Sequence, residues 1–205
     1  MKKQIRDESK EQIYIKPIKV GNSSIEVKST NGSTYIPHRQ VPENVRKMVG
    51  RELGESKQKS IRNLDTEYED CFYYTSDKKY GIPAAAFMGS ILDACVACDI
   101  PKTKIKRAFK IIGDIIPLKY GSVRRRIDTV RRSGMTAAPD IRHRPEFVNW
   151  SCVLNVQYDV NQITLDQIVN LVSQAGFSSG VGDWRPSAPK SSGNHGMYMV
   201  SKTSR

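Results

Sequence analysis

A strand pattern followed by a capped helix pattern places the strongest constraint on how this chain can fold. In residues 150–158 apolar and polar side chains alternate, which predicts a strand with one buried face. In residues 164–175 apolar side chains recur at helical spacing, and Thr164 and Gln167 form a capping box at their start. A further short strand is predicted at 197–200. The C-terminal part is therefore expected to fold as strand, helix and strand.

The earlier apolar segments predict a similar alternation. Residues 13–27 are rich in strand-forming side chains and are predicted as strand, turn and strand, with the turn at residues 21–22. Residues 83–100 are predicted as a buried helix, and residues 109–118 as a strand with Gly113 near its centre. The whole order predicts an α+β, ferredoxin-like (βαββαβ) core, in which two helices cover one face of an antiparallel four-stranded sheet.

Two polar segments interrupt this order and are expected to be insertions. Residues 28–80 are rich in lysine, glutamate, serine and asparagine, with one helix predicted at 41–53. Residues 119–149 are rich in arginine and lack a hydrophobic stripe. Residues 1–11 have almost no apolar side chains and are expected to form a flexible tail, which leaves 12–205 as a single domain.

The charge of the chain favours a polyanionic partner. The formal net charge is +12 and the pI is about 9.6, and such proteins attract polyanions through long-range steering and counterion release. Thirteen lysines and arginines lie between residues 102 and 144, against three aspartates. Because arginine binds phosphate through several N–H donors, we expect nucleic acid, with an anionic membrane surface as the alternative. The predicted contacts here are Lys106, Arg107, Lys119, Arg124, Arg125, Arg126, Arg131, Arg132, Arg142 and Arg144.

A glycine-rich segment at residues 180–200 leads from the predicted helix to the last strand. Glycine lets the backbone turn sharply and brings N–H groups close to a ligand, so such loops suit phosphate. Trp184 in this segment, and Tyr120 in the basic one, are candidates for stacking on the bases of a single strand. A plain connection with a flexible tip is the alternative interpretation. The predicted contacts in the loop are Gly180, Gly182, Trp184, Arg185, Lys190, Gly193, His195 and Gly196.

Catalytic and metal-binding motifs are weak in this sequence. His143 and His195 are candidate catalytic residues, because a histidine among cations can act in RNA cleavage. The chain has no Walker A sequence, HExxH motif or nucleophile elbow. Cys95 and Cys98 form a CxxC pair without a second pair of ligands, so we expect no metal site, and no cofactor is implied. We therefore expect a binding protein rather than an enzyme.

Three features together resemble the RAMP superfamily and, within it, the Cas7-like backbone proteins of CRISPR effector complexes. Residues 180–196 look like the RAMP glycine-rich loop, and residues 80–89 are similar to the segment that opens the first helix in many members. The insertions at 28–80 and 119–149 fall where Cas7-like proteins carry a helical region and a thumb hairpin. The helix opener departs from the pattern, with three alanines at residues 84–86 where serines are common.

The resemblance implies sequence-independent binding of single-stranded RNA, or of DNA, by copies of the protein that self-associate along the strand. Backbone N–H groups of the glycine loop and of the first helix would hold phosphates, and a thumb carrying the arginines would clamp the strand or reach a neighbouring copy. RNA-cleaving relatives place an aspartate in the first insertion, whereas this sequence has none between Val20 and Leu64. Binding without cleavage is the expectation that follows.

Two alternative functions fit the same residues. One is a metal-independent endoribonuclease of the same superfamily that uses His143 or His195. The other is a phage structural or assembly protein whose positive charge faces the genome or an acidic partner. The sequence has no apolar run long enough to cross a bilayer and no secretory signal, so we expect a cytoplasmic protein without a membrane partner. If the protein is phage-encoded, that compartment is the host cytoplasm.

Overall fold

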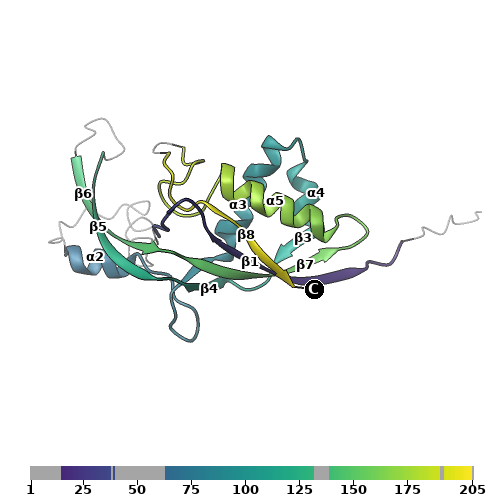
Figure 1. Cartoon of the computed structure of the whole chain (residues 1–205), viewed down its shortest axis with the longest axis horizontal. Helices are drawn as coiled ribbons and strands as arrows, with labels where there is room; N and C mark the ends of the chain where they lie inside the picture. Colours follow the sequence, from purple (N-terminus) through teal and green to yellow (C-terminus); the bar gives the residue numbers. More distant parts are fainter. Residues whose placement is uncertain (1–14, 38, 40–62, 132–138, 190–191, 205) are drawn as a thin grey trace, which may run out of the picture.

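The chain folds as an α+β protein in which helices cover one face of an antiparallel sheet, as the computed structural model shows (Figure 1). The strands are β1 (Val20–Ser29), β2 (Gly81–Pro83), β3 (Phe109–Ile111), β4 (Ile115–Lys119), β5 (Ser122–Arg131), β6 (Pro139–Val148), β7 (Ser151–Asp159) and β8 (Tyr198–Ser204). The helices are α2 (Leu64–Asp70), α3 (Ala84–Ala97), α4 (Lys102–Ala108) and α5 (Leu165–Ser178). The described residues are 15–37, 39, 63–131, 139–189 and 192–204. None of the helices among them combines the length and apolar character needed to cross a membrane.

Several predicted features fall outside the described residues. They are the tail at 1–11, the helix at 41–53, Arg132 and Lys190. The backbone of Arg131 belongs to β5, but the position of its side chain is not described.

The central sheet has six strands, where the sequence predicted four. The strands lie in the order β2–β4–β7–β1–β8, β3 also pairs with β7, and every one of these pairs is antiparallel. One extra strand arises because the segment predicted as a single strand at 109–118 is interrupted at Gly113, whose φ is 99°. β3 and β4 therefore pair with β7 in two different registers. The other extra strand is β2, which pairs with β4 at the edge of the sheet immediately before α3.

β1 is one continuous strand, so the predicted turn at residues 21–22 was wrong. Gly21 pairs with Tyr158, and Asn22 pairs with Gln157, in the ladder between β1 and β7. Gly21 is required by a close contact, because a Cβ at this position would lie 2.6 Å from Cζ of the Tyr158 ring. Gly21 is therefore required for tight packing within the sheet. From the sequence alone, a glycine with this role cannot be distinguished from a glycine that forms a turn.

α3 and α5 pack together on one face of the sheet and bury the main hydrophobic core (Figure 1). Inward side chains such as Ile25 of β1 and Leu154 of β7 have no exposed surface. α5 presents Leu171 and its apolar neighbours to this core, and truncation of such a buried leucine to alanine costs about 2–5 kcal/mol. The capping box predicted from Thr164 and Gln167 is present at the start of α5.

The helix predicted at 83–100 is shorter than expected and is followed by a second helix that the sequence did not predict. α3 ends at Ala97, and α4 begins directly after Pro101. α4 has seven residues and buries only Ile105 and Ala108, so it is too short for a periodic apolar pattern to stand out.

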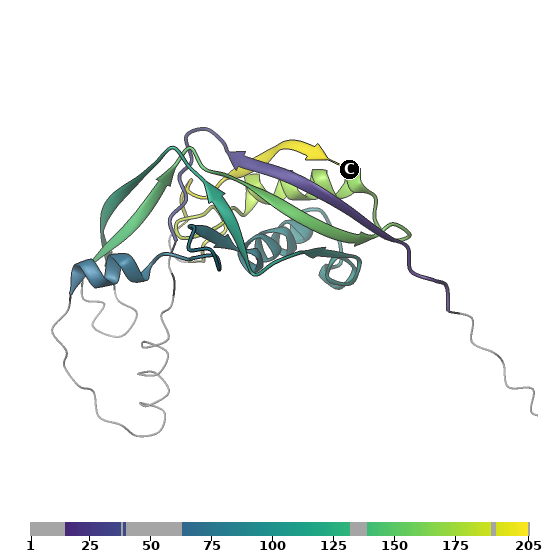
Figure 2. The ribbon, with the colours of Figure 1, turned by 90° about the horizontal axis from the view of Figure 1, so that it is seen from below.

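β5 and β6 form a separate two-stranded hairpin that extends beyond the central sheet (Figure 2). It lies within the segment 119–149 that was predicted as a basic insertion. Each strand has ten residues, and side chains that are paired across the ladder share a face. The register divides the hairpin into two faces. The inner face carries Arg124, Arg126, Asp128, Asp140, Arg142, Arg144 and Glu146, and the outer face carries Arg125, Ile127, Ile141 and His143.

The short helix α2 packs against the outer face of the hairpin. Arg125 donates to a carboxylate oxygen of Asp65 at 2.6 Å and to the carbonyl of Leu64 at 3.2 Å. Its guanidinium also lies 4.9 Å from the centre of the Tyr68 ring. Arg125 was predicted to contact nucleic acid, and in the structure it joins α2 to the hairpin.

Candidate functional site

The glycine-rich loop, defined here as residues 180–197, connects α5 to β8 and packs against the segment that follows β1. At Gly182, where φ is 80°, a Cβ would lie 2.6 Å from the carbonyl oxygen of Ile36. At Gly196, where φ is 68°, a Cβ would lie 1.7 Å from the carbonyl oxygen of Val181. Both positions combine a left-handed backbone with no space for a side chain, so both require glycine.

These glycines do not leave the whole loop backbone free for a ligand. Five N–H groups donate to carbonyls of the protein at 2.7–3.0 Å, namely those of Gly180, Val181, Asp183, Ala188 and Gly196. Among the described residues, the N–H groups of Gly182, Trp184, Arg185, Ser192 and Asn194 find no acceptor. The backbone donors that the described part of the loop could offer to a ligand therefore lie in residues 182–185 and 192–194.

A buried arginine fastens the loop to the hairpin. Arg144 of β6 is 2% exposed, and its two terminal nitrogens donate to Asp128 of β5 at 2.6 Å and to Asp183 of the loop at 2.5 Å. Removing one partner of a buried ion pair costs about 3–5 kcal/mol, because the other charge is left without water or a counter-charge. Arg144 was predicted as a phosphate contact, and the structure uses it to hold the hairpin and the loop together.

A second set of contacts surrounds Arg126 on the same inner face. Arg126 donates to Asp128 at 2.8 Å and to Glu146 at 3.3 Å. The Thr34 hydroxyl donates its only proton to Glu146 at 2.8 Å, so its oxygen accepts from the Nδ1–H of His195, also at 2.8 Å. Nε2 of His195 then faces a terminal nitrogen of Arg126 at 3.4 Å. Both ring nitrogens of His195 are thus engaged by the protein.

Burial and the neighbouring charges hold this network in one protonation state. Burial, reinforced by the positive charge of Arg126, keeps the pKa of His195 below 6.5, so the ring is neutral at pH 7. Burial alone would raise the pKa of Asp128, but hydrogen bonds from Arg126 and Arg144 outweigh it and keep that pKa below 3.8. Asp128 is therefore ionised and lies between two guanidinium groups.

The other candidate catalytic histidine is also engaged. Nδ1 of His143, on the outer face of the hairpin, accepts from Nε of Arg125 at 2.9 Å. His143 and His195 lie on different faces of the hairpin structure, so they do not form a pair for acid–base catalysis. Within the described part of the chain, no group of three or more histidines, cysteines or acidic residues could hold a metal ion.

Trp184 lies on the inner face of the hairpin. The guanidinium carbons of Arg126 and Arg144 are 5.5 Å and 5.8 Å from the centre of its ring. Such cation–π contacts are worth about 0.5–2 kcal/mol, depending on how far the pair is removed from water. Arg126 and Arg144 are directly opposite each other in the hairpin, so both guanidinium groups reach the half-buried ring from the inner face.

The remaining predicted cations lie in three separate places. On the inner face, Arg124 is exposed and makes no ion pair with any described residue, and Arg142 is 39% exposed at 3.9 Å from Asp140. Lys119 is exposed at the end of β4, on the opposite side of the strand from the buried Leu118. Lys106 and Arg107 are exposed in the last turn of α4, far from the hairpin (Figure 1). Tyr120 packs against the aromatic cluster at the base of the hairpin.

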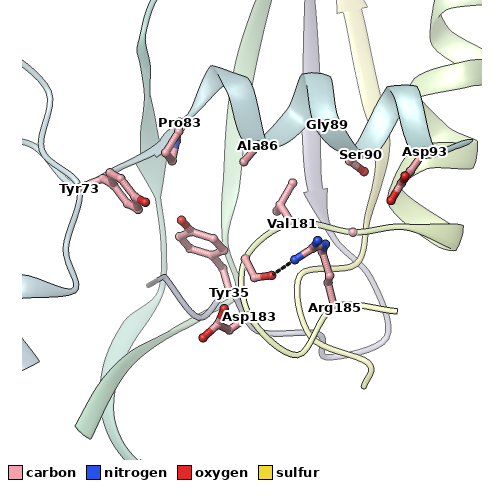
Figure 3. Close-up of a pocket in the computed structure, with 12 residues that line it drawn as sticks. Tyr35, Tyr73, Pro83, Ala86, Gly89, Ser90, Asp93, Val181, Asp183 and Arg185 are labelled. Atoms are coloured by element: carbon pink, nitrogen blue, oxygen red, sulfur yellow. Dashed lines mark hydrogen bonds between the residues drawn. The ribbon is translucent and has the colours of Figure 1, made fainter. Parts of the chain in front are cut away.

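A cavity of about 440 Å³ lies between α3 and the glycine-rich loop (Figure 3). Its polar side chains come from Tyr35, Tyr73, Ser90, Asp93, Asp183 and Arg185, and small residues of α3 form the opposite wall. The guanidinium of Arg185 donates to the Gly182 carbonyl at 3.1 Å and, as Figure 3 shows, is directed into the cavity. A volume of this size is in the range of small-ligand sites and much larger than a single ion needs.

Sequence reasoning missed most of the groups that organise this region. Asp128, Glu146 and Asp183 supply the acceptors that bind the arginines, and Thr34 joins Glu146 to His195, yet none of the four was singled out. Asp128 could have been suspected because it interrupts an arginine run, but its partners depend on the hairpin register. Tyr35 follows β1 in a segment without a motif, so nothing in the sequence pointed to it.

Searches with this sequence find no matching protein-family model and no matching curated protein. The fold and the geometry of this region therefore carry the functional inference.

Proposed function

We propose that this protein binds single-stranded nucleic acid without sequence preference, on the surface formed by the inner face of the hairpin and the glycine-rich loop. The observation that carries the proposal is the fixed juxtaposition of two features. Buried Arg144 ties the loop to the hairpin, so half-buried Trp184 is held against the same inner face that carries the cations Arg124 and Arg142. A basic strip with an aromatic ring is the arrangement that captures a single strand through its phosphates and bases. RNA is favoured over DNA by the resemblance to RAMP proteins.

The charge balance of the inner face supports this assignment. Asp128 binds Arg126 and Arg144, Glu146 binds Arg126 and Thr34, and Asp140 lies 3.9 Å from Arg142. Each carboxylate of this face therefore has a partner within the protein. Arg124 is exposed and forms no ion pair with a described residue, although Glu146 lies directly opposite it in the ladder. Arg124 therefore lies beside the hydrogen-bonded network of Arg126, Asp128, Arg144 and Glu146 and takes no part in it.

The open face of the central sheet is less suited to bind bases. Proteins of the RRM type stack bases on aromatic side chains of this face. Here the exposed side chains of β1 and β7 are polar or aliphatic, and they bond to one another, as between Ser24 and Asn155 at 2.8 Å and between Asn22 and Gln157 at 3.2 Å. We therefore place the interface on the hairpin and the loop.

We also propose that the core is ferredoxin-like, with additions. If β3 and β4 count as one interrupted strand, the antiparallel order is β8–β1–β7–β3/β4, with α3 and α5 on one face. This order agrees with a βαββαβ unit. On this interpretation β2, α4 and the hairpin are additions, and the hairpin corresponds to the thumb of Cas7-like proteins.

We further propose that copies of the protein line up along the bound strand through the outer face of the hairpin. Ile127 and Ile141 lie on that face and are 63% and 50% exposed. Exposed apolar side chains on a projecting element are typical of interaction surfaces. Light scattering of complexes with oligonucleotides of increasing length should show a mass that rises in steps of one protomer. Replacing both isoleucines with serine should abolish the steps without weakening the binding of one copy.

The binding proposal is tested with fluorescein-labelled single-stranded RNA and DNA by polarisation over a salt series. The test variant is Arg124→Gln/Arg142→Gln, which removes two positive charges from the inner face. The matched control is Lys106→Gln/Arg107→Gln, which removes two charges from α4 at the other end of the molecule. Each phosphate contact to a single strand contributes about 0.7 to the slope of log K against log salt concentration.

The expected outcome is salt-dependent binding whose slope falls by about 1.4 in the hairpin variant and by less in the α4 variant. Equal losses in the two variants would show that only the net charge matters and would place the interface elsewhere. No binding by the wild type at low salt would refute the proposed function.

A further inference from the structure

We propose that the cavity between α3 and the glycine-rich loop binds the phosphate group of a mononucleotide, either free or at the 5′ end of a strand. The proposal goes beyond capture of a strand by the hairpin, because the cavity lies on the other side of the loop, against α3. The cavity proposal is also independent of strand capture, because a free nucleotide could bind in the cavity even if no oligonucleotide binds the hairpin.

The first observation is a buried hydroxyl without a protein partner. Tyr35 is 1% exposed, and its hydroxyl forms no hydrogen bond with any described residue. Figure 3 shows this hydroxyl directed into the cavity, at the end that lies below Pro83. A bound group that accepts from this hydroxyl would supply the hydrogen bond that the protein does not.

The second observation is the first turn of α3, which lies at the same end of the cavity. Pro83 and Ala86 line the cavity, and no side chain caps the helix at Pro83. α3 has 14 residues, so its N-terminus carries a partial positive charge that favours an anion. The N–H of Ala84 donates to the Asp114 carbonyl at 2.8 Å, which leaves the N–H groups of Ala85 and Ala86 without an acceptor among the described residues.

The third observation is the charge balance of the cavity wall. Asp183 is paired with Arg144 at 2.5 Å, and Asp93 faces Lys102 at 4.0 Å. Arg185 forms no ion pair with a described residue, so it is the cation of the wall without a counter-charge. An anionic ligand is therefore favoured.

The shape of the cavity favours a nucleotide over an inorganic ion. A volume of about 440 Å³ leaves most of the space empty if only phosphate is bound. Beyond Arg185, the carboxylate of Asp93 lies at the far end of the cavity, where it can accept hydrogen bonds from ribose hydroxyls or base N–H groups (Figure 3). The phosphate would lie at the Tyr35 end, and the nucleoside would extend toward Asp93.

The test compares the binding of adenosine 5′-monophosphate, adenosine and inorganic phosphate to the full chain by calorimetry. Its second arm compares a 5′-phosphorylated oligonucleotide with the same oligonucleotide bearing a 5′-hydroxyl. The key variant is Tyr35→Phe, which removes only the unpartnered hydroxyl. The matched control is Tyr198→Phe, which removes the hydroxyl of an equally buried tyrosine that does not line the cavity and that donates to Ser90 at 3.1 Å.

The two substitutions should have opposite effects on stability and affinity. Tyr35→Phe should leave the melting temperature unchanged or raise it, and should weaken the binding of the phosphorylated probe roughly 10- to 100-fold, as expected for a lost hydrogen bond to a charged group. Tyr198→Phe should lower the melting temperature and leave the affinity unchanged.

The outcomes separate the two possible sources of the phosphate. Binding of adenosine 5′-monophosphate that is lost in Tyr35→Phe identifies a site for free nucleotides. A preference for the 5′-phosphorylated oligonucleotide alone, again lost in Tyr35→Phe, identifies a site for strand ends. No preference for either phosphorylated probe, or equal affinity in wild type and Tyr35→Phe, would overturn the proposal.

Discussion

Replacing Arg144 with methionine should remove the link between the hairpin and the glycine-rich loop. Methionine keeps the apolar stem but leaves Asp128, which is 7% exposed, without one of its two guanidinium partners. Asp128 retains Arg126 at 2.8 Å, so the loss should lie near the lower end of the range for a broken buried pair, at about 3 kcal/mol. Asp183 is about one third exposed and can be hydrated, so it should add little.

The assay is urea unfolding followed by circular dichroism at pH 7. Arg124→Met is the matched control, because Arg124 is exposed and unpaired among the described residues, and it should change stability by less than about 0.5 kcal/mol. Adding Asp128→Asn to Arg144→Met should restore part of the loss, because it removes the stranded charge. A loss below about 1 kcal/mol for Arg144→Met would refute the reasoning, because a buried pair cannot be that weak when one partner is deleted.

The pH dependence of the same variant follows from the lowered pKa of Asp128. In the wild type this group binds protons less readily in the folded than in the unfolded chain, so it contributes stability that is fully present above about pH 4. That contribution is lost as the pH falls through the folded pKa, which lies below 3.8. The difference in stability between wild type and Arg144→Met should therefore narrow below about pH 4.

Three further predictions concern His195, the cysteines and the loop glycine. Because the pKa of His195 is lowered in the folded chain, the wild type loses stability as the pH falls below 6.5. The difference in unfolding free energy between wild type and His195→Asn should therefore shrink between pH 7.5 and 5. A difference that stays constant over this range would contradict the prediction. Iodoacetamide at pH 8 should first label exposed Cys98, because the other cysteines are buried and burial raises the pKa of Cys71 to about 11. Intact-mass spectrometry should show one early adduct. Faster modification of Cys71 than of Cys98 would contradict the prediction. Gly182→Ala should lower stability by about 1–3 kcal/mol, because its Cβ would meet the Ile36 carbonyl. Gly89→Ala in α3, where a Cβ meets nothing within 4 Å, should leave stability unchanged or raise it in the same melting experiment.

The elements that local pattern dictates could be predicted from the sequence. The alternation in 150–158 and the capping box at Thr164 specify β7 and α5 without reference to the rest of the chain. Elements that depend on distant partners were not predictable in the same way. β2 is a strand because it pairs with β4, and Gly21 is in a strand because Tyr158 lies across it. Both features are set by tertiary contacts, which override local turn signals.

The arginine-rich segment shows the same limit at the level of the site. Composition predicted a uniform set of phosphate contacts, whereas the register gives neighbouring arginines different partners. Arg124 is free, Arg125 binds α2, and Arg126 binds Asp128. Because side chains alternate between two faces of a strand, adjacent residues cannot be assigned one role from charge alone. The loop glycines were recognised as special, but two of them are required by backbone packing rather than by a ligand.

The most direct test of the central claim is to map the contact site of single-stranded RNA on the protein. RNA carrying 4-thiouridine is crosslinked to the full chain by ultraviolet light, and the modified peptides are identified by mass spectrometry. The account predicts adducts within β5, β6 and the loop at 180–197, with Trp184 among the modified positions, and their loss in Arg124→Gln/Arg142→Gln. Crosslinks confined to α4 or to the open face of the central sheet, or no crosslinks at all, would contradict it.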